Sequence, residues 1–159
     1  MSDARFSSSV FLPDERETTC LAEQIAPLLL PGDTVLLSGE VGAGKSHFAR
    51  AVIKTLMAVQ GLNEDVPSPT FTLVQTYELG GVEVWHADLY RLTGPGEIIE
   101  TGLTDAFETG ICLVEWPDRL AELTPNSALY LDLSEEGEGR RLKADGPARW
   151  QKISEVLCD

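Results

Sequence analysis

Long apolar runs, closely spaced cysteines and an excess of positive charge are all missing from this sequence of 159 residues. No apolar run approaches the roughly 18 residues that a membrane-spanning helix needs. The opening residues, MSDARFSSSV, lack the basic and apolar regions of a secretory signal. Cys20, Cys112 and Cys158 are widely spaced and match neither a disulfide framework nor a zinc pattern. We therefore expect a protein of the reducing cytoplasm with no membrane partner.

The charge of the chain is strongly one-sided. Asp and Glu number 26 against 12 Lys and Arg, a formal net charge of −14 at pH 7. Direct nucleic-acid binding relies on cationic groups that displace counterions, so such a chain repels a polyanion over most of its surface. One basic cluster stands near the end, and it is either a solvated face or a docking patch for a partner: Arg140, Arg141, Lys143, Arg149 and Lys152.

Length and hydrophobic pattern predict one α/β domain over residues 1–159. Strands and helices alternate in the first part of the chain and strands pair later, which predicts a three-layer fold of the P-loop NTPase type around a central mixed β-sheet. The expected strands are 6–13, 34–38, a hairpin of 72–77 and 82–88, an apolar strand that ends at 115, and a terminal pair at 127–134 and 140–144. The expected helices are 14 to about 29, capped by Asp14, then 45–60, 95–108 with a break at Gly102, and a last one from about 147.

The segment Gly39-Glu40-Val41-Gly42-Ala43-Gly44-Lys45-Ser46 matches the pattern Gly-x-x-x-x-Gly-Lys-Ser/Thr in full. Its glycines let backbone N–H groups turn inward around an anion, and the helix that follows points its positive end at the same place. Lys45 is expected to reach the β- and γ-phosphates, and Ser46 to offer its hydroxyl to Mg²⁺. Because a predicted strand precedes the motif and a predicted helix follows it, it indicates binding of a nucleoside triphosphate.

Two strand-end carboxylates are candidates for the metal side of such a site. Asp88 ends the segment VEVWHAD, in which Glu83 and His86 make a poor buried strand, whereas Glu115 ends the fully apolar segment ICLVE. Strand-end carboxylates are also commonly caps or surface charges, so both interpretations stay open. If both serve, one holds Mg²⁺ and the other orients the attacking water.

The segment PSPTFT is a second suggestive element. Its prolines stiffen a loop that presents Ser68, Thr70 and Thr72, and in phosphate switches a loop hydroxyl can sense the γ-phosphate and its metal. An ordinary proline-rich turn is the alternative.

Three further side chains border these motifs. From the sequence alone, His47 and His86 are more typical of structural histidines than of catalytic ones, although His47 directly follows the loop. Trp116, beside Glu115, either packs in the core or covers the site.

Four stretches, taken together and in this order, resemble the TsaE family (also called YjeE): LSGEVGAGKSHFAR, VPSPTFTLVQTY, HADLYRL and ICLVEWP. They span about residues 13–120, and SPTFTL and DLYR behind such a loop carry most of the specificity. Glu40, Val41 and His47 depart mildly from the family, in which Asp, Leu and Thr are common at these places. None of these departures removes a phosphate or metal contact.

The resemblance implies a bacterial ATPase of slow turnover that works with proteins of the TsaD and TsaB type, which transfer a threonylcarbamoyl group to adenosine 37 of ANN-decoding tRNAs. It implies ATP on the loop 39–46 with His47 beside it, and adenine near Asp14 and Glu15. It implies Mg²⁺ on Ser46, Glu115 and Asp88, and a catalytic set that also includes Lys45 and Thr70. Since the chain is so acidic, we expect it to dock on a partner and to reset it through ATP, without binding tRNA tightly itself.

Two other classes of protein share the loop. A small-molecule kinase is the main alternative, but such kinases bring several arginines from a lid, and no arginine-bearing lid stands out between residues 95 and 125. A regulatory GTPase needs Asn- or Thr-Lys-x-Asp for guanine, and none of the four lysines lies in such a motif.

Overall fold

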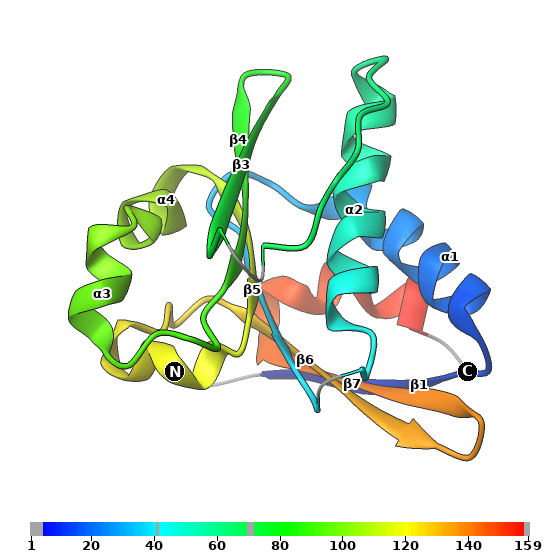
Figure 1. Ribbon diagram of the computed structural model, residues 1–159. Coiled ribbons are helices and arrows are strands. Elements are labelled where there is room, and N and C mark those ends of the chain that lie inside the picture. The colour runs from blue at the N-terminus through cyan, green and yellow to red at the C-terminus, as the bar shows by residue number, and fades with distance from the viewer. Residues whose placement is uncertain (1–4, 41, 70–71, 158–159) are drawn as a thin grey trace.

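A computed structural model describes residues 5–40, 42–69 and 72–157, which form three layers around one seven-stranded sheet (Figure 1). The strand order is β1-β7-β6-β2-β5-β4-β3. The four inner strands β6, β2, β5 and β4 run parallel, and β7, β1 and β3 pair antiparallel with their neighbours. The prediction of an α/β fold with a central mixed sheet is therefore confirmed. The strands are β1 (Arg5–Leu12), β2 (Thr34–Ser38), β3 (Val74–Leu79), β4 (Val82–Asp88), β5 (Ile111–Glu115), β6 (Leu129–Glu136) and β7 (Gly139–Pro147).

Helices cover both faces of the sheet, and each face has its own hydrophobic cluster. On one face lie α1 (Glu15–Ile25), the short 3₁₀ turn η1 (Ala26–Leu28), α2 (Lys45–Val59) and the 3₁₀ helix η3 (Ala148–Leu157). On the other lie α3 (Pro95–Glu100), α4 (Leu103–Thr109) and the 3₁₀ segment η2 (Pro117–Leu123). Strand β5 is buried throughout, because helices cover it on both sides and parallel strands pair with it on both edges.

The first helix and β4 are among the elements that differ from the expectation. The first helix ends at Ile25 and continues only as the turn η1, because Pro27 has no N–H for a further α-helical bond. Strand β4 is not a poor buried strand but an interior one, between β5 and β3. Glu83 points to solvent, while His86 is fully buried and bonded to another side chain, which makes its polarity compatible with the interior.

Most of the basic cluster near the end of the chain makes contacts inside the molecule. The buried carboxylate of Asp33 accepts hydrogen bonds from Arg149 at 2.8 Å and Lys152 at 2.6 Å, which ties η3 to the start of β2. Arg140 donates to backbone carbonyls of the glycine loop. Arg140, Arg149 and Lys152 are therefore neither purely solvated nor free to form a docking patch.

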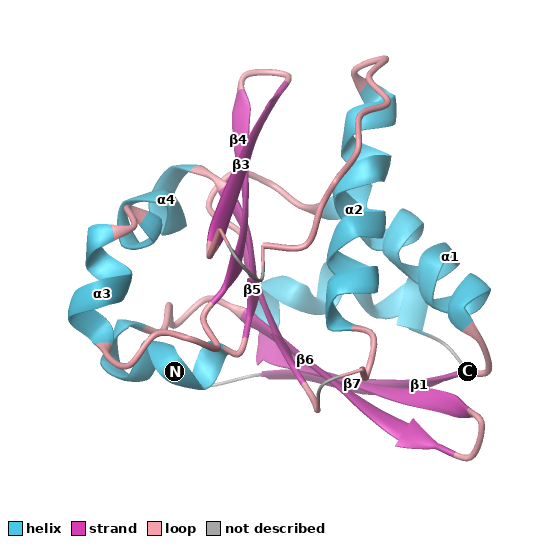
Figure 2. Cartoon of the chain, viewed as in Figure 1, coloured by secondary structure: helices cyan, strands magenta, loops and turns pink. Residues whose placement is uncertain are grey.

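The carboxyl ends of β2, β4 and β5 meet at one edge of the sheet, where ligands bind in open parallel sheets. The connection from β2 to α2 lies at this edge, together with the turns that follow β4 and β5 (Figure 2). None of the helices in the described ranges is long and apolar enough to cross a membrane.

Candidate functional site

The glycine loop has a backbone that only glycine adopts easily. Gly39, Gly42 and Gly44 have φ angles of 136°, 85° and 107°. At Gly39 there is a second constraint, because a Cβ atom would lie 2.3 Å from the carbonyl oxygen of Leu133 in β6. Gly44 is the N-cap of α2, so the loop ends directly at the positive end of a 15-residue helix.

The Lys45 side chain folds back over the loop. Its Nζ donates to the carbonyl oxygens of Gly39 at 2.6 Å and Glu40 at 2.9 Å, and lies 4.4 Å from the ring centroid of Trp116. Burial lowers the pKa of Lys45, and the nearby carboxylates of Glu115, Asp88 and Asp132 oppose that shift. The ammonium group is thus held by neutral carbonyls at the mouth of the loop, with carboxylates close by.

Ser46 and Glu115 are in direct contact, although 69 residues separate them in the sequence. The Ser46 hydroxyl donates to the Glu115 carboxylate, with Oγ 2.8 Å from Oε1 and 3.0 Å from Oε2. The contact forms because α2 begins at the same sheet edge at which β5 ends. Glu115 is only 2% exposed.

Asp88 completes this end of the site. It stands opposite Glu115 in the pairing of β4 with β5, and its Oδ1 accepts a hydrogen bond from the Tyr90 backbone N–H at 3.0 Å. A cavity of about 480 Å³ joins these side chains, and its lining is Gly42, Gly44, Lys45, Ser46, His47, Asp88, Tyr90, Glu115 and Trp116. Trp116 is half-buried and packs on Tyr90, with the two ring centroids 4.8 Å apart. It also lines this cavity, so it combines both expected roles, packing against a neighbour and bordering the site.

A second cavity, of about 330 Å³, lies on the other flank of the loop. The start of α1 contributes Asp14 and Glu15, and the hairpin of β6 and β7 contributes Arg140. The guanidinium of Arg140 donates to the carbonyl oxygens of Ala43 at 3.2 Å and Gly42 at 3.3 Å. Asp14 uses its Oδ1 to cap α1 at the Glu17 N–H.

Comparison with known proteins places the chain in a family. The family model described as threonylcarbamoyl adenosine biosynthesis protein TsaE matches residues 12–142. The chain belongs to the TsaE family.

Named relatives agree with this assignment. The tRNA threonylcarbamoyladenosine biosynthesis protein TsaE of Rickettsia felis is 39% identical over 133 residues, which cover 84% of this chain and 76% of the relative. The protein of the same name from Bacillus subtilis is 34% identical over 126 residues, 79% of this chain and 76% of the relative. Among solved structures, YdiB of Bacillus subtilis superposes with a TM-score of 0.78 at 27% identity, covering 98% of this chain and 97% of that one.

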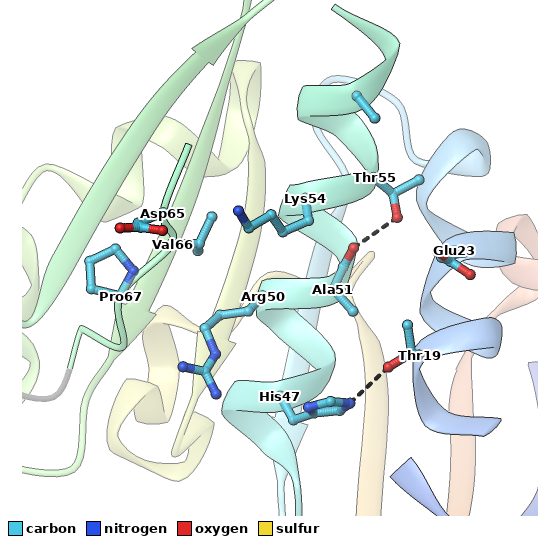
Figure 3. Close-up of a pocket in the computed structure, with 11 residues that line it drawn as sticks. Thr19, Glu23, His47, Arg50, Ala51, Lys54, Thr55, Asp65, Val66 and Pro67 are labelled. Atoms are coloured by element: carbon cyan, nitrogen blue, oxygen red, sulfur yellow. Dashed lines mark hydrogen bonds between the residues drawn. The ribbon is translucent and has the colours of Figure 1, made fainter. Parts of the chain in front are cut away.

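In this TsaE-family chain His47 connects α2 to α1. Its Nε2 lies 2.9 Å from the Thr19 hydroxyl, and Figure 3 shows the ring directed toward Thr19. His47 also borders both cavities beside the loop and a third, open one of about 890 Å³ between α1, α2 and residues 65–67. The charged side chains that line this groove are of mixed sign (Figure 3): Glu23, Arg50, Lys54 and Asp65.

Not every residue expected at the site lines the first cavity. The Glu40 backbone carbonyl accepts from Lys45, and the residue lines a separate hollow with Asp132 and Leu133. Val41 and Thr70 lie outside the described residues. Glu15 borders the second cavity and not the first.

Two residues at the site of this TsaE-family chain were missed as site residues in the sequence. His86 contacts Glu115, and the available signal was its spacing: two residues before Asp88 on a strand, it shares a face with Asp88. Arg140 touches the loop across 97 residues of sequence, and no local pattern could have indicated that.

Proposed function

We propose that this TsaE-family protein binds ATP with Mg²⁺ on the loop Gly39–Ser46, hydrolyses it slowly, and serves tRNA threonylcarbamoyladenosine biosynthesis together with partner proteins. The observation that carries the proposal is the meeting of Lys45, Ser46 and Glu115 in one cavity at the mouth of a glycine loop. The pathway is supported by the family and by the names of the relatives.

The proposed position of the ATP phosphates in the first cavity follows from the geometry of Lys45 and of α2. Phosphate oxygens that enter the first cavity compete with the Gly39 and Glu40 carbonyls for the Lys45 ammonium. The exchange favours phosphate, because charge-assisted hydrogen bonds are stronger than bonds to neutral carbonyls. The N-terminus of α2 adds unpaired backbone N–H groups directed at the same anion.

The residues present fit Mg²⁺. Its ligands in nucleotide sites are oxygens from one or two carboxylates, a hydroxyl and the substrate phosphates. Ser46 Oγ and Glu115 Oε1 lie 2.8 Å apart with Asp88 in the same cavity. Ser46 and Glu115 would hold the ion with help from Asp88, and when bound it would neutralise charge that develops on the phosphates.

The water-orienting role is shared between the two carboxylates in this proposal. Asp88 and Glu115 both face the first cavity, and a carboxylate there can accept a proton from, or orient, an attacking water. Thr70, in the switch-like loop, keeps its predicted part at the γ-phosphate.

The second cavity suits the base of the nucleotide. It adjoins the loop at Gly42–Gly44 and reaches the start of α1, where Asp14 and Glu15 lie. Arg140 offers a planar guanidinium there, a group that stacks well on aromatic rings. We therefore propose that adenine lies between the start of α1 and the β6–β7 hairpin.

The partners follow from the pathway. We propose that the chain docks in the cytoplasm on threonylcarbamoyl-transferase proteins of the TsaD and TsaB type, and that ATP binding or turnover resets them between cycles. The net charge of −14 argues against tight binding of tRNA by this chain alone. Tight, salt-sensitive retention of tRNA by the isolated protein in a filter-binding assay would contradict this part.

The decisive experiment compares Lys45→Ala with Lys54→Ala. Both lysines are on α2, but Lys54 bonds Asn63 and the Glu64 backbone, away from the loop. Because hydrogen bonds to charged groups contribute about 1.5–3 kcal/mol, Lys45→Ala should weaken ATP binding about tenfold or more. Lys54→Ala should bind as the wild type does. Glu115→Ala and Asp88→Ala should lower hydrolysis more than binding.

Hydrolysis is then measured with and without the partner transferase proteins. Slow turnover that changes when the partners are added supports the proposal. Equal ATP affinity of Lys45→Ala and wild type would overturn the binding site. Brisk turnover indifferent to partners, or transfer of phosphate to a small metabolite, would overturn the coupled role and favour a kinase.

A further inference from the structure

His86 is a buried polar residue in the interior of the sheet. It is 0% exposed, and its Nε2 lies 2.7 Å from Oε2 of Glu115. Its other ring nitrogen, Nδ1, has no hydrogen-bond partner among the described residues. Since a buried polar atom without a partner costs about 1–3 kcal/mol, an apolar side chain would suit the core better than this histidine. The contact with Glu115 is therefore the feature that calls for a histidine here.

The position of His86 in the sheet explains that contact. Side chains two apart on a strand share a face, so His86 and Asp88 point to the same side of β4. Strand β4 pairs with β5 so that Asp88 lies beside Glu115 and His86 beside Leu113. The ring thus reaches Glu115 from the interior of the sheet, while Ser46 reaches it from α2.

The Glu115 carboxylate is consequently held at two points. An ionised carboxylate only accepts hydrogen bonds, so in that form Ser46 donates to it through Oγ and His86 donates through Nε2. His86 contacts Oε2, and the Ser46 hydroxyl lies close to both oxygens, 2.8 Å from Oε1 and 3.0 Å from Oε2, so the two partners together fix the orientation of the carboxylate. Without the hydrogen bond from His86, the Glu115 side chain could rotate. The Glu115 and Ser46 oxygens would then no longer be held side by side before a cation binds.

We propose that His86 is a positioning residue that fixes the Glu115 carboxylate for a divalent cation bound with the nucleotide. The inference rests on the proposed Mg²⁺·ATP function and names a residue of that site to which no sequence motif assigned a role. Partners that orient a metal-ligating side chain typically contribute 10- to 100-fold to metal affinity. His86 is expected to act on the metal and not on the nucleotide itself, because it contacts Glu115 and does not line either cavity beside the loop.

The test is a matched pair of amide substitutions, His86→Gln and His86→Asn. The glutamine amide nitrogen reaches about as far as Nε2 and can still donate to Glu115, whereas that of asparagine stops near Nδ1. Thr34→Val serves as the control for removing a buried polar group from the sheet, since Thr34 is buried at the opposite end of β2. The three variants and the wild type are compared as full-length chains.

Two affinities are measured for each protein, with thermal melting as a record of folding. The first is the affinity of the protein for a fluorescent ADP in the presence of EDTA. The second is the affinity of the protein–ADP complex for Mn²⁺, measured by electron paramagnetic resonance. We expect His86→Asn to bind Mn²⁺ about 10- to 100-fold more weakly while its ADP affinity in EDTA stays within about twofold. His86→Gln and Thr34→Val should stay close to the wild type in both.

Each of the following outcomes would overturn the proposal. Wild-type Mn²⁺ affinity in His86→Asn would show that Glu115 needs no such support. A loss of equal size in His86→Gln, or in the ADP affinity without metal, would show a general structural role. If the wild type itself bound ADP in EDTA but no Mn²⁺, the Mg²⁺ site and with it the role of His86 would fail. If it bound no nucleotide at all, the proposed function would fail.

Discussion

The substitution Gly39→Ala tests whether the shape of the glycine loop is set by β6. Gly39 has a φ of 136°, and an added Cβ atom would lie 2.3 Å from the carbonyl oxygen of Leu133. Leu133 is paired with Leu142 of β7, and the residue before it, Asp132, is paired with Ser38 of β2, so this oxygen has little freedom to move away. Gly42 is the matched control, because its φ is also positive, 85°, and an added Cβ would meet nothing within 4 Å.

The two variants separate backbone strain from steric overlap. A non-glycine residue held at such a φ costs about 1–3 kcal/mol, and both variants carry this term. Overlap in a packed region adds about 1–3 kcal/mol, and only Gly39→Ala carries it. We therefore expect the free energy of unfolding of Gly39→Ala to lie about 2 kcal/mol below that of Gly42→Ala. For a chain of this size, that difference lowers the melting temperature by roughly 4–8 °C.

The assay is thermal and urea unfolding of both variants and the wild type, followed by circular dichroism in EDTA and without nucleotide. Under these conditions no ligand contributes, so the result depends on the packing of the loop alone. Equal melting temperatures of the two variants would refute the reasoning, because they would show that β6 or the loop relaxes at no cost.

Two further predictions concern single buried groups. Asp33→Asn should lower the free energy of unfolding by about 2 kcal/mol, since Asp33 is buried and accepts hydrogen bonds from Arg149 and Lys152. The control is Asp145→Asn, which removes an exposed ion pair with Arg5 and should cost about 0–1 kcal/mol. Equal losses of the two variants in urea unfolding would contradict this prediction. Burial raises the pKa of Cys112 from 9.0 to about 12, so iodoacetamide at pH 9 should modify the exposed Cys20 and spare Cys112 until urea unfolds the chain, as peptide mapping would show. Equal modification of Cys20 and Cys112 in the folded chain would contradict the burial of Cys112. Because the unfolded thiol loses its proton at a lower pH than the folded one, the stability of the wild type relative to Cys112→Ala should be constant below pH 9 and fall as the pH rises toward 12.

Local patterns predicted much of the secondary structure. The run TVLLS and the run ICLVE became β2 and β5, because continuous apolar residues suit strands covered on both faces. The spacing of Phe48, Val52 and Ile53 became the buried side of α2. The break at Gly102 separates α3 from α4, since Gly102 has a φ of 87° as the N-cap of α4. Each of these signals depends on neighbours within a few residues.

The candidate site was predicted in part for the same reason. The glycine loop with Lys45 and Ser46 is one continuous motif, and the positions of its glycines indicate the backbone conformation that the loop needs. The carboxylates of Asp88 and Glu115 were named as candidates only because each ends a strand. Their nearness to Ser46 depends on which strands are neighbours in the sheet. The spacing of residues along the sequence does not reveal the order of the strands.

The sequence by itself determined most of the helices and strands, the glycine loop and the membership of an α/β fold, because these depend on propensities and contacts within a few residues. The tertiary structure alone decided that β4 is interior, that Glu115 bonds both Ser46 and His86, and that Arg140 braces the loop from the C-terminal hairpin. These contacts join residues 29 to 97 positions apart. Such pairs are brought together by the order and register of the strands, which are fixed by the packing of both faces of the whole sheet at once.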